Sequence, residues 1–373
     1  MKAPYLLTPG PLTTSDTVKE KMLRDWGSRD GAFIAMNSEM RERLVALANA
    51  SGTHVCVPLQ GSGTFAIEAT IATLLPRDGR LLVLVNGAYG KRMVQITRTM
   101  GRSVEALEWR EDQLVDPRAL DQRLAEDRNI THVAVVHCET TSGILNPIEA
   151  VAEVVEAHGR ALIIDAMSAF GALPLDAATL PFTAVVASSN KCLQGVPGMG
   201  FALIRRDVLE QCKGNAHSLS LDLFDQWEGF ERNGQWRFTP PTQVIAAFLQ
   251  ALDEHAAEGG VVGRGARYAR NHEVLVDGME ALGFRCLLER KHQAPIIVTF
   301  HMPADPHFGF ADFYERLSAR GFLIYPGKLT VADSFRIGCI GDLGETEMRA
   351  ALEAISSVLE EMGVHDGAPA LTA

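Results

Sequence analysis

The sequence lacks paired cysteines, long apolar runs and any excess of basic residues. Its six cysteines are scattered over 373 residues with no Cys-x-x-Cys pair, which argues against a disulfide framework or a zinc site and indicates reduced thiols. No apolar stretch approaches the roughly 18 residues needed to span a bilayer, and the first 15 residues lack the apolar core of a signal peptide. We therefore expect a cytoplasmic protein without a bound metal.

Acidic side chains outnumber basic ones: 46 Asp and Glu stand against 35 Lys and Arg, for a net charge of −11. Nucleic acids and anionic membranes bind cationic surfaces, so this balance argues against both as partners. A small anionic ligand is not excluded, because salt screens the net field over about 10 Å or less and the residues of a pocket decide what binds there. The 47% of hydrophobic residues predict a folded globular chain.

Short apolar runs alternate with helical stretches through the first two hundred residues. The runs are continuous rather than alternating, which is typical of strands covered on both faces and joined by helical crossovers. This pattern predicts a doubly wound α/β fold. The runs expected as strands are 55–59, 81–85, 104–107, 133–137, 162–165, 184–187 and 201–204.

After about residue 214 the pattern changes. The segment 215–241 is rich in aromatic residues, and either a subunit interface or buried core accounts for it. We expect a large domain over 16–258, and a smaller α+β domain formed by 259–373 together with the N-terminal arm 1–15. The second half holds apolar runs at 284–288, 296–300, 322–325 and 335–339, with helices expected near 242–258, 264–282, 310–320 and 345–362.

A glycine-containing turn, Gly61-Ser62-Gly63-Thr64, lies between an expected strand and an expected helix. Glycines permit close approach of the backbone, and the free N–H groups at a helix start favour a phosphate. The pattern also satisfies the Gly-x-Gly-x-x-Ala fingerprint of dinucleotide sites, but the next strand ends in Asn86-Gly87 rather than in an acidic residue. A phosphate monoester is favoured, with a dinucleotide and a plain tight turn as alternatives.

Two ionisable side chains follow apolar strands: Asp165 closes the run 161–164, and Lys191 follows 184–187. The carboxyl ends of strands are where α/β folds build their sites. Taken alone, Lys191 could reach from a strand end to water and Asp165 could cap a helix. Pyridoxal phosphate requires a Schiff-base lysine, an acidic partner for the pyridine nitrogen and a phosphate cradle. Lys191, Asp165 and the turn at 61–64 are that combination.

With these features the chain resembles the class V group of fold-type-I pyridoxal-phosphate aminotransferases, which includes alanine–glyoxylate and serine–pyruvate enzymes. The resemblance runs from residue 7 to residue 338 and so covers nearly the whole chain. It implies a large domain with a mostly parallel seven-stranded sheet and a smaller C-terminal α+β domain. The matching motifs lie at 7–12, 61–64, 86–90, 137–143, 165–168, 188–191, 237–241 and 335–338.

The resemblance also implies roles for individual residues. Pyridoxal 5'-phosphate would be bound covalently to Lys191, which then acts as the proton-transferring base, while Asp165 keeps a proton on the pyridine nitrogen. Thr239 matches a position that reaches the phosphate from the neighbouring subunit, so a homodimer is implied. The remaining cofactor contacts implied by the resemblance are Ser62, Gly63, Thr64, Tyr89, Thr141, Met167 and Asn190. Tyr89 would stack on the pyridine ring, although an ordinary aromatic residue in a turn is the alternative.

Arg336 matches the arginine that binds the acid group of the substrate, and Arg29 is a further candidate contact. A guanidinium suits a carboxylate or a phosphonate; pairing with a structural carboxylate is the alternative for Arg336. The implied reaction, in phosphonate catabolism, moves the amino group of 2-aminoethylphosphonate to pyruvate and gives phosphonoacetaldehyde and L-alanine. An alanine/serine–glyoxylate or serine–pyruvate aminotransferase is the alternative.

Other classes fit the residues less well. A lyase of the cysteine-desulfurase type needs a cysteine on a mobile loop, and none occurs between Cys286 and Cys339. A binding protein without activity would not need to keep Asp165, Lys191 and Arg336 together. The histidines and aspartate of the stretch 301–307 lie among prolines, which favours a solvated loop over a metal site.

Overall fold

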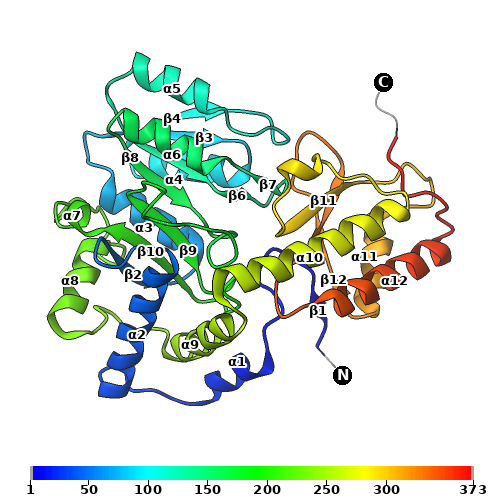
Figure 1. The fold of residues 1–373 in the computed structure, drawn as a ribbon, viewed down its shortest axis with the longest axis horizontal. Coiled ribbons are helices and arrows are strands. Elements are labelled where there is room, and N and C mark those ends of the chain that lie inside the picture. Colours follow the sequence, from blue (N-terminus) through cyan, green and yellow to red (C-terminus); the bar gives the residue numbers. More distant parts are fainter. Residues whose placement is uncertain (1–2, 371–373) are drawn as a thin grey trace.

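The protein is described by a computed structural model over residues 3–370, and its centre is a seven-stranded sheet (Figure 1). The strand order is β2-β10-β9-β8-β5-β3-β4, and every neighbouring pair is parallel except for the two pairs made by β10, which are antiparallel. The α/β prediction with a mostly parallel sheet is therefore confirmed. The strands are β2 (His54–Gln60), β3 (Arg80–Val85), β4 (Ser103–Glu108), β5 (Ile130–Val136), β8 (Ala161–Asp165), β9 (Ala184–Ser188) and β10 (Met199–Arg205).

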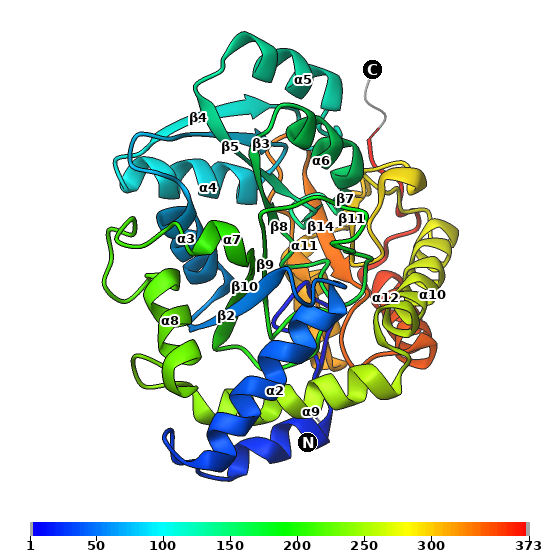
Figure 2. The ribbon, with the colours of Figure 1, turned by 60° about the vertical axis from the view of Figure 1, so that its left-hand side comes forward.

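Helices cover both faces of this sheet, which explains why its central strands are mostly apolar. Val133 and Val135 of β5 pack in one core, whereas Ala134 and Val136 pack in a second core on the opposite face, as the two-residue period of a strand requires. The first core is covered by α2 (Gly31–Leu47), α5 (Pro117–Glu126), α6 (Ile148–Ala157) and α9 (Thr242–Ala257). Figure 2 shows the helices of the second core on one side: α3 (Gly63–Leu74), α4 (Ala88–Thr99) and α8 (Leu223–Asn233).

The C-terminal part of the chain forms a third core, drawn in yellow to red on the right of Figure 1. An antiparallel sheet of order β11-β14-β13 packs there with long helices. The N-terminal strand β1 (Tyr5–Leu6) pairs in parallel with β12 (Phe322–Leu323), and Leu7 is buried in the same core. The elements are α10 (Gly260–Ala281), β11 (Ile297–His301), α11 (Phe310–Ala319), β13 (Tyr325–Pro326), β14 (Ser334–Gly338) and α12 (Glu345–Met362).

Helix α10 connects the sheet to this third core. It buries Tyr268 in the first core of the large sheet and Leu275 in the C-terminal core. The division into 16–258 and 1–15 with 259–373 stays a prediction. The apolar run at 284–288 forms no strand, and its Cys286 makes only an isolated bridge to Phe300.

The remaining elements are short, apart from the helix α8 that forms within the aromatic segment 215–241. Among residues 3–370, every helix is too short or too polar to cross a membrane. The short elements are α1 (Asp16–Glu20), η1 (Lys21–Leu23), β6 (Cys138–Glu139), β7 (Ile144–Leu145), α7 (Arg206–Leu209) and η2 (Arg290–His292).

Candidate active site

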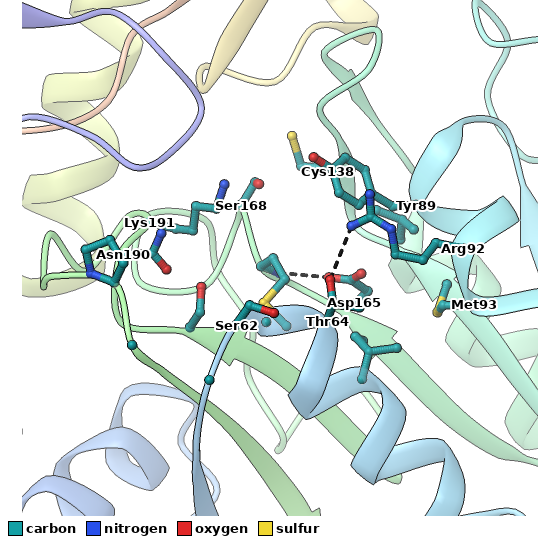
Figure 3. Close-up of a pocket in the computed structure, with 18 residues that line it drawn as sticks. Ser62, Thr64, Tyr89, Arg92, Met93, Cys138, Asp165, Ser168, Asn190 and Lys191 are labelled. Carbon is teal, nitrogen blue, oxygen red and sulfur yellow. Dashed lines mark hydrogen bonds between the residues drawn. The ribbon is translucent and has the colours of Figure 1, made fainter. Parts of the chain in front are cut away.

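A cavity of about 360 Å³ opens at the carboxyl ends of the central strands (Figure 3). The strands β5, β8 and β9 are parallel neighbours, so the residues that follow them meet at one edge. Helices α3 and α4 begin at the same edge, and their first turns complete the wall. Eight of the ten predicted cofactor contacts line this cavity: Ser62, Gly63, Thr64, Tyr89, Asp165, Met167, Asn190 and Lys191.

The side chain of Lys191 lies in the cavity wall beneath the N-terminal arm. Its Nζ donates hydrogen bonds to the carbonyl oxygen of Pro9 at 2.7 Å and to that of Gly10 at 3.4 Å. The pKa of Lys191 is lowered to about 8, chiefly by burial and to a smaller extent by the charge of Arg336, while Asp165 acts in the opposite direction. The amine is therefore neutral near physiological pH far more often than an ordinary lysine, and the neutral form is the one that attacks a carbonyl carbon.

Asp165 ends β8 and is 5% exposed. Burial raises the pKa of Asp165 to about 6, and the N–H of Met167, which donates to Oδ1 at 3.1 Å, opposes that rise. Glu139 raises this pKa as well, whereas Arg92 and Lys191 lower it. A buried carboxyl group of this kind is ionised when a cation sits beside it. Asp165 can therefore hold a protonated ring nitrogen in the cavity.

The start of α3 has the features of an anion site. Helix α3 begins at Gly63, and the hydroxyl of Ser62 makes no capping hydrogen bond, so it is available to a ligand. The first N–H groups of a helix have no partner inside the helix and attract anions. A Cβ at position 63 would crowd the sulfur of Met167, so a larger residue there would require that side chain to move. Together with the hydroxyl of Thr64, this turn can hold a phosphate.

The stacking candidate Tyr89 is fixed by a buried glutamate. Glu139 is 0% exposed and accepts hydrogen bonds from the N–H of Tyr89 at 3.0 Å and that of Thr141 at 3.2 Å. The hydroxyl of Thr141 also donates to Glu139, and it accepts from the N–H of Ala88 at 3.3 Å. A Cβ at Gly87 would clash with the buried side chains of Glu139 and Thr141. Thr141 therefore lies behind the cavity wall, where it joins the start of α4 to the β6–β7 turn.

Arg336 is buried on β14, 1% exposed, and does not line the cavity. Its Nε and Nη2 donate to the carbonyl oxygen of Pro326 at 3.1 and 3.0 Å, and its Nη1 donates to that of Thr140 at 2.8 Å. These partners are backbone carbonyls, so the alternative that Arg336 pairs with a structural carboxylate is wrong. Burial lowers its pKa below the ordinary value for arginine. Each terminal nitrogen retains one N–H, and the two together can grip an acid group.

Two predicted residues lie outside this arrangement. Arg29 is exposed just before α2, and Thr239 is exposed just before α9; neither lines the cavity. Both roles stay predictions. At the suspected metal stretch, His307 Nδ1 lies 3.0 Å from Asp305 Oδ1, and within residues 3–370 no three His, Cys, Asp or Glu side chains are grouped as metal ligands would be.

Several site residues escaped the sequence reasoning. Arg92, Cys138 and Ser168 line the cavity, and Glu139 supports it from behind. Arg92 could have been found, because a residue three positions after Tyr89 lies on the same face of a helix. Glu139 could have been noticed as a charged residue within a run that is otherwise apolar or uncharged. The contact of Lys191 with the carbonyl oxygens of Pro9 and Gly10 could not be predicted from sequence, since every residue has a backbone carbonyl.

Comparison with known proteins is consistent with this geometry. The family model described as Aminotransferase class-V matches residues 17–331. The chain is 55% identical over 361 residues to 2-aminoethylphosphonate–pyruvate transaminase 2 of Burkholderia lata, which covers 97% of this chain and 96% of that protein. It is 54% identical over 364 residues to 2-aminoethylphosphonate–pyruvate transaminase of Pseudomonas putida, with 98% and 99% covered.

Solved structures share the fold. The pyridoxamine–pyruvate aminotransferase of Mesorhizobium loti is 25% identical, with a TM-score of 0.89 over 98% of this chain and 95% of that one. The ureidoglycine–glyoxylate aminotransferase of Bacillus subtilis has the same TM-score of 0.89 at 22% identity, over 97% of this chain and 94% of that one. At 22% identity, the similarity to the ureidoglycine–glyoxylate aminotransferase shows only that the two proteins share a fold.

Proposed function

This chain belongs to the class-V aminotransferase family, and we propose that it moves the amino group of 2-aminoethylphosphonate to pyruvate, giving phosphonoacetaldehyde and L-alanine. The relatives named for this reaction are 54–55% identical over nearly the full chain. One structural observation carries the proposal. A single cavity holds the half-buried amine of Lys191, the buried carboxyl group of Asp165 and the anion-binding start of α3.

The cavity residues fit pyridoxal phosphate, the cofactor of this family. Lys191 offers a partly neutral amine to an aldehyde, and Asp165 offers a carboxylate to a ring nitrogen. Gly63, where a Cβ would crowd the side chain of Met167, leaves the start of α3 open to a phosphate. When bound, the cofactor draws electrons away from the carbon that carries the substrate nitrogen.

The protein's own side chains then bind, orient and move protons. Lys191 takes a proton from the substrate carbon and returns one, because its amine, with a lowered pKa, can both accept and donate near neutral pH. Asp165 keeps the ring nitrogen protonated from the buried end of β8. Tyr89 stacks on the ring while Glu139 holds its backbone. Asn190 assists at the phosphate, and Met167 forms the apolar contact beside the ring.

Arg336 is proposed to bind the acid group of each substrate in turn. A phosphonate from the donor and a carboxylate from pyruvate present similar oxygen pairs to a guanidinium. The two N–H groups that Pro326 and Thr140 leave free suit such a pair. Arg29, which is exposed at the start of α2, is proposed as a second phosphonate contact.

We also propose a homodimer in which Thr239 reaches the phosphate site of the second subunit. Its exposure on this chain supports that role. Phe238 beside it is 42% exposed, and Phe65 beside the phosphate turn is 51% exposed; aromatic side chains of this size are usually covered. A cytoplasmic location is part of the proposal, supported by six cysteines that are all unpaired.

The test is an assay of alanine formation from pyruvate with a panel of donors: 2-aminoethylphosphonate, serine, glutamate and β-alanine. We expect clear preference for 2-aminoethylphosphonate and no turnover by Lys191→Ala, with Lys213→Ala, an exposed lysine away from the cavity, as the matched control. A preference for serine would overturn the substrate assignment and favour a serine–pyruvate enzyme. Turnover retained by Lys191→Ala would remove this lysine from the reaction.

A further inference from the structure

Arg92 has a defined position in the cavity wall and no role so far. It lies in the second turn of α4, and its Nη1 donates to the hydroxyl of Thr64 at 3.3 Å, the bond that Figure 3 draws as a dashed line. The guanidinium carbon lies 4.9 Å from the centre of the Tyr89 ring. The side chain is therefore held between the phosphate turn and the stacking tyrosine, although it is exposed at the cavity mouth.

The charge of Arg92 helps to lower the pKa of Asp165, but it is not neutralised in an ion pair. In the described part of the chain no carboxylate lies within ion-pairing distance of it, and its one side-chain hydrogen bond goes to Thr64. Most of its five N–H donors are free, and the stacking on Tyr89 fixes their direction. A fixed guanidinium with free donors on a cavity wall is suited to an oxyanion.

The phosphate turn needs such a charge. Ser62, Gly63 and Thr64 offer hydroxyls and N–H groups, which are neutral donors, whereas a phosphate monoester carries a charge between −1.5 and −2 near pH 7, roughly. Among residues 3–370, the basic side chains lining the cavity are Arg92 and Lys191. Lys191 is directed to the carbonyls of Pro9 and Gly10, so Arg92 is the cation next to the turn.

We propose that Arg92 binds the cofactor phosphate, as a charged partner to the neutral donors at the start of α3. This inference rests on the proposed function. The hydrogen bond to Thr64 places the guanidinium beside that turn. Because Arg92 also contacts Tyr89, the same side chain would act on both the phosphate and the ring of the cofactor. Arg92 is thus a cofactor-binding residue that also orients Tyr89.

The test compares two ligands that differ only in the phosphate. Apoprotein is titrated with pyridoxal phosphate and with pyridoxal, and the dissociation constants are measured by absorbance. Arg92→Met should weaken the binding of pyridoxal phosphate by about 10-fold to 100-fold, the range for hydrogen bonds to a charged group. It should weaken the binding of pyridoxal far less, because only the contact with Tyr89 bears on that ligand. The affinity of Arg92→Lys for pyridoxal phosphate should lie between that of the wild type and that of Arg92→Met. Arg98→Met, an exposed arginine in the last turn of the same helix, serves as the control.

The outcomes separate the possible roles. An equal loss of affinity for pyridoxal phosphate and for pyridoxal in Arg92→Met would overturn the proposal, because Arg92 would then act only by orienting Tyr89. Unchanged cofactor affinity with a raised KM for 2-aminoethylphosphonate would also overturn it, since the guanidinium would then meet the substrate. A wild-type apoprotein that binds neither ligand would instead overturn the proposed function, and this inference with it.

Discussion

The side-chain nitrogen of Lys191 lies 2.7 Å from the carbonyl oxygen of Pro9, a residue 182 positions earlier in the chain. The N-terminal arm thus supplies the direct polar contact of the amine proposed to do the chemistry. The arm is fixed in turn by the pairing of β1 with β12 and by the burial of Leu7 in the C-terminal core. Movement of that core therefore changes the environment of Lys191.

Gly10→Ala is expected to disturb this contact. A Cβ at position 10 would lie 2.5 Å from Cδ of Lys191, and the backbone φ of +121° disfavours any side chain. The strain alone should lower stability by about 1–3 kcal/mol, and displacement of Lys191 should weaken cofactor binding as well. Gly52→Ala is the matched control, because Gly52 has φ +84° but open space around it. Equal cofactor affinity in the two variants would contradict a role for Gly10 at the lysine.

The lowered pKa of Lys191 predicts how cofactor capture depends on pH. Only the neutral amine reacts, so the rate at which apoprotein takes up pyridoxal phosphate should rise with pH and level off above about 8. An amine with the ordinary lysine pKa of 10.5 would still be gaining rate at pH 10. Stopped-flow absorbance measures the rate, and a free model amine corrects for titration of the cofactor. A plateau reached only near pH 10 would show that burial does not lower this pKa.

Glu139→Gln is expected to loosen the wall behind the cofactor. Glutamine keeps one acceptor oxygen where the carboxylate offers two to Tyr89 and Thr141, so a buried donor loses its partner. That loss should cost about 1–3 kcal/mol of unfolding free energy, and the circular dichroism of the bound cofactor should weaken. Urea unfolding and visible circular dichroism check the two effects. Glu149→Gln, on the exposed first turn of α6, is the control.

Arg336→Lys should impair both half-reactions. Lysine retains the positive charge, but its three N–H donors cannot make the three bonds to Pro326 and Thr140 and also a two-pronged contact with an acid group. We expect KM for 2-aminoethylphosphonate and for pyruvate to rise by about 10-fold to 100-fold. Thermal unfolding distinguishes this loss from general destabilisation. If only one substrate were affected, the proposal that Arg336 serves both acid groups would be wrong.

Much of the sheet and part of the site follow from local sequence. All seven apolar runs expected as sheet strands are strands, because most of them are buried on both faces and a buried strand is apolar whatever its neighbours in the sequence. The turn at 61–64, Asp165 and Lys191 stand out for a similar reason: polar residues directly after apolar strands mark the edge where parallel strands end. Membership of the aminotransferase class is also carried by such short motifs and is confirmed by the family match.

Local sequence patterns indicate which residues could do the chemistry, whereas the fold settles which of them lie together. Sheet order and the return of the N-terminal arm bring Pro9 to Lys191, Glu139 to Tyr89, and Thr140 with Pro326 to Arg336. These contacts join backbone groups and buried side chains that are distant along the chain, so no local pattern encodes them. The antiparallel direction of β10 is of the same kind, since strand direction depends on the connection and not on the strand.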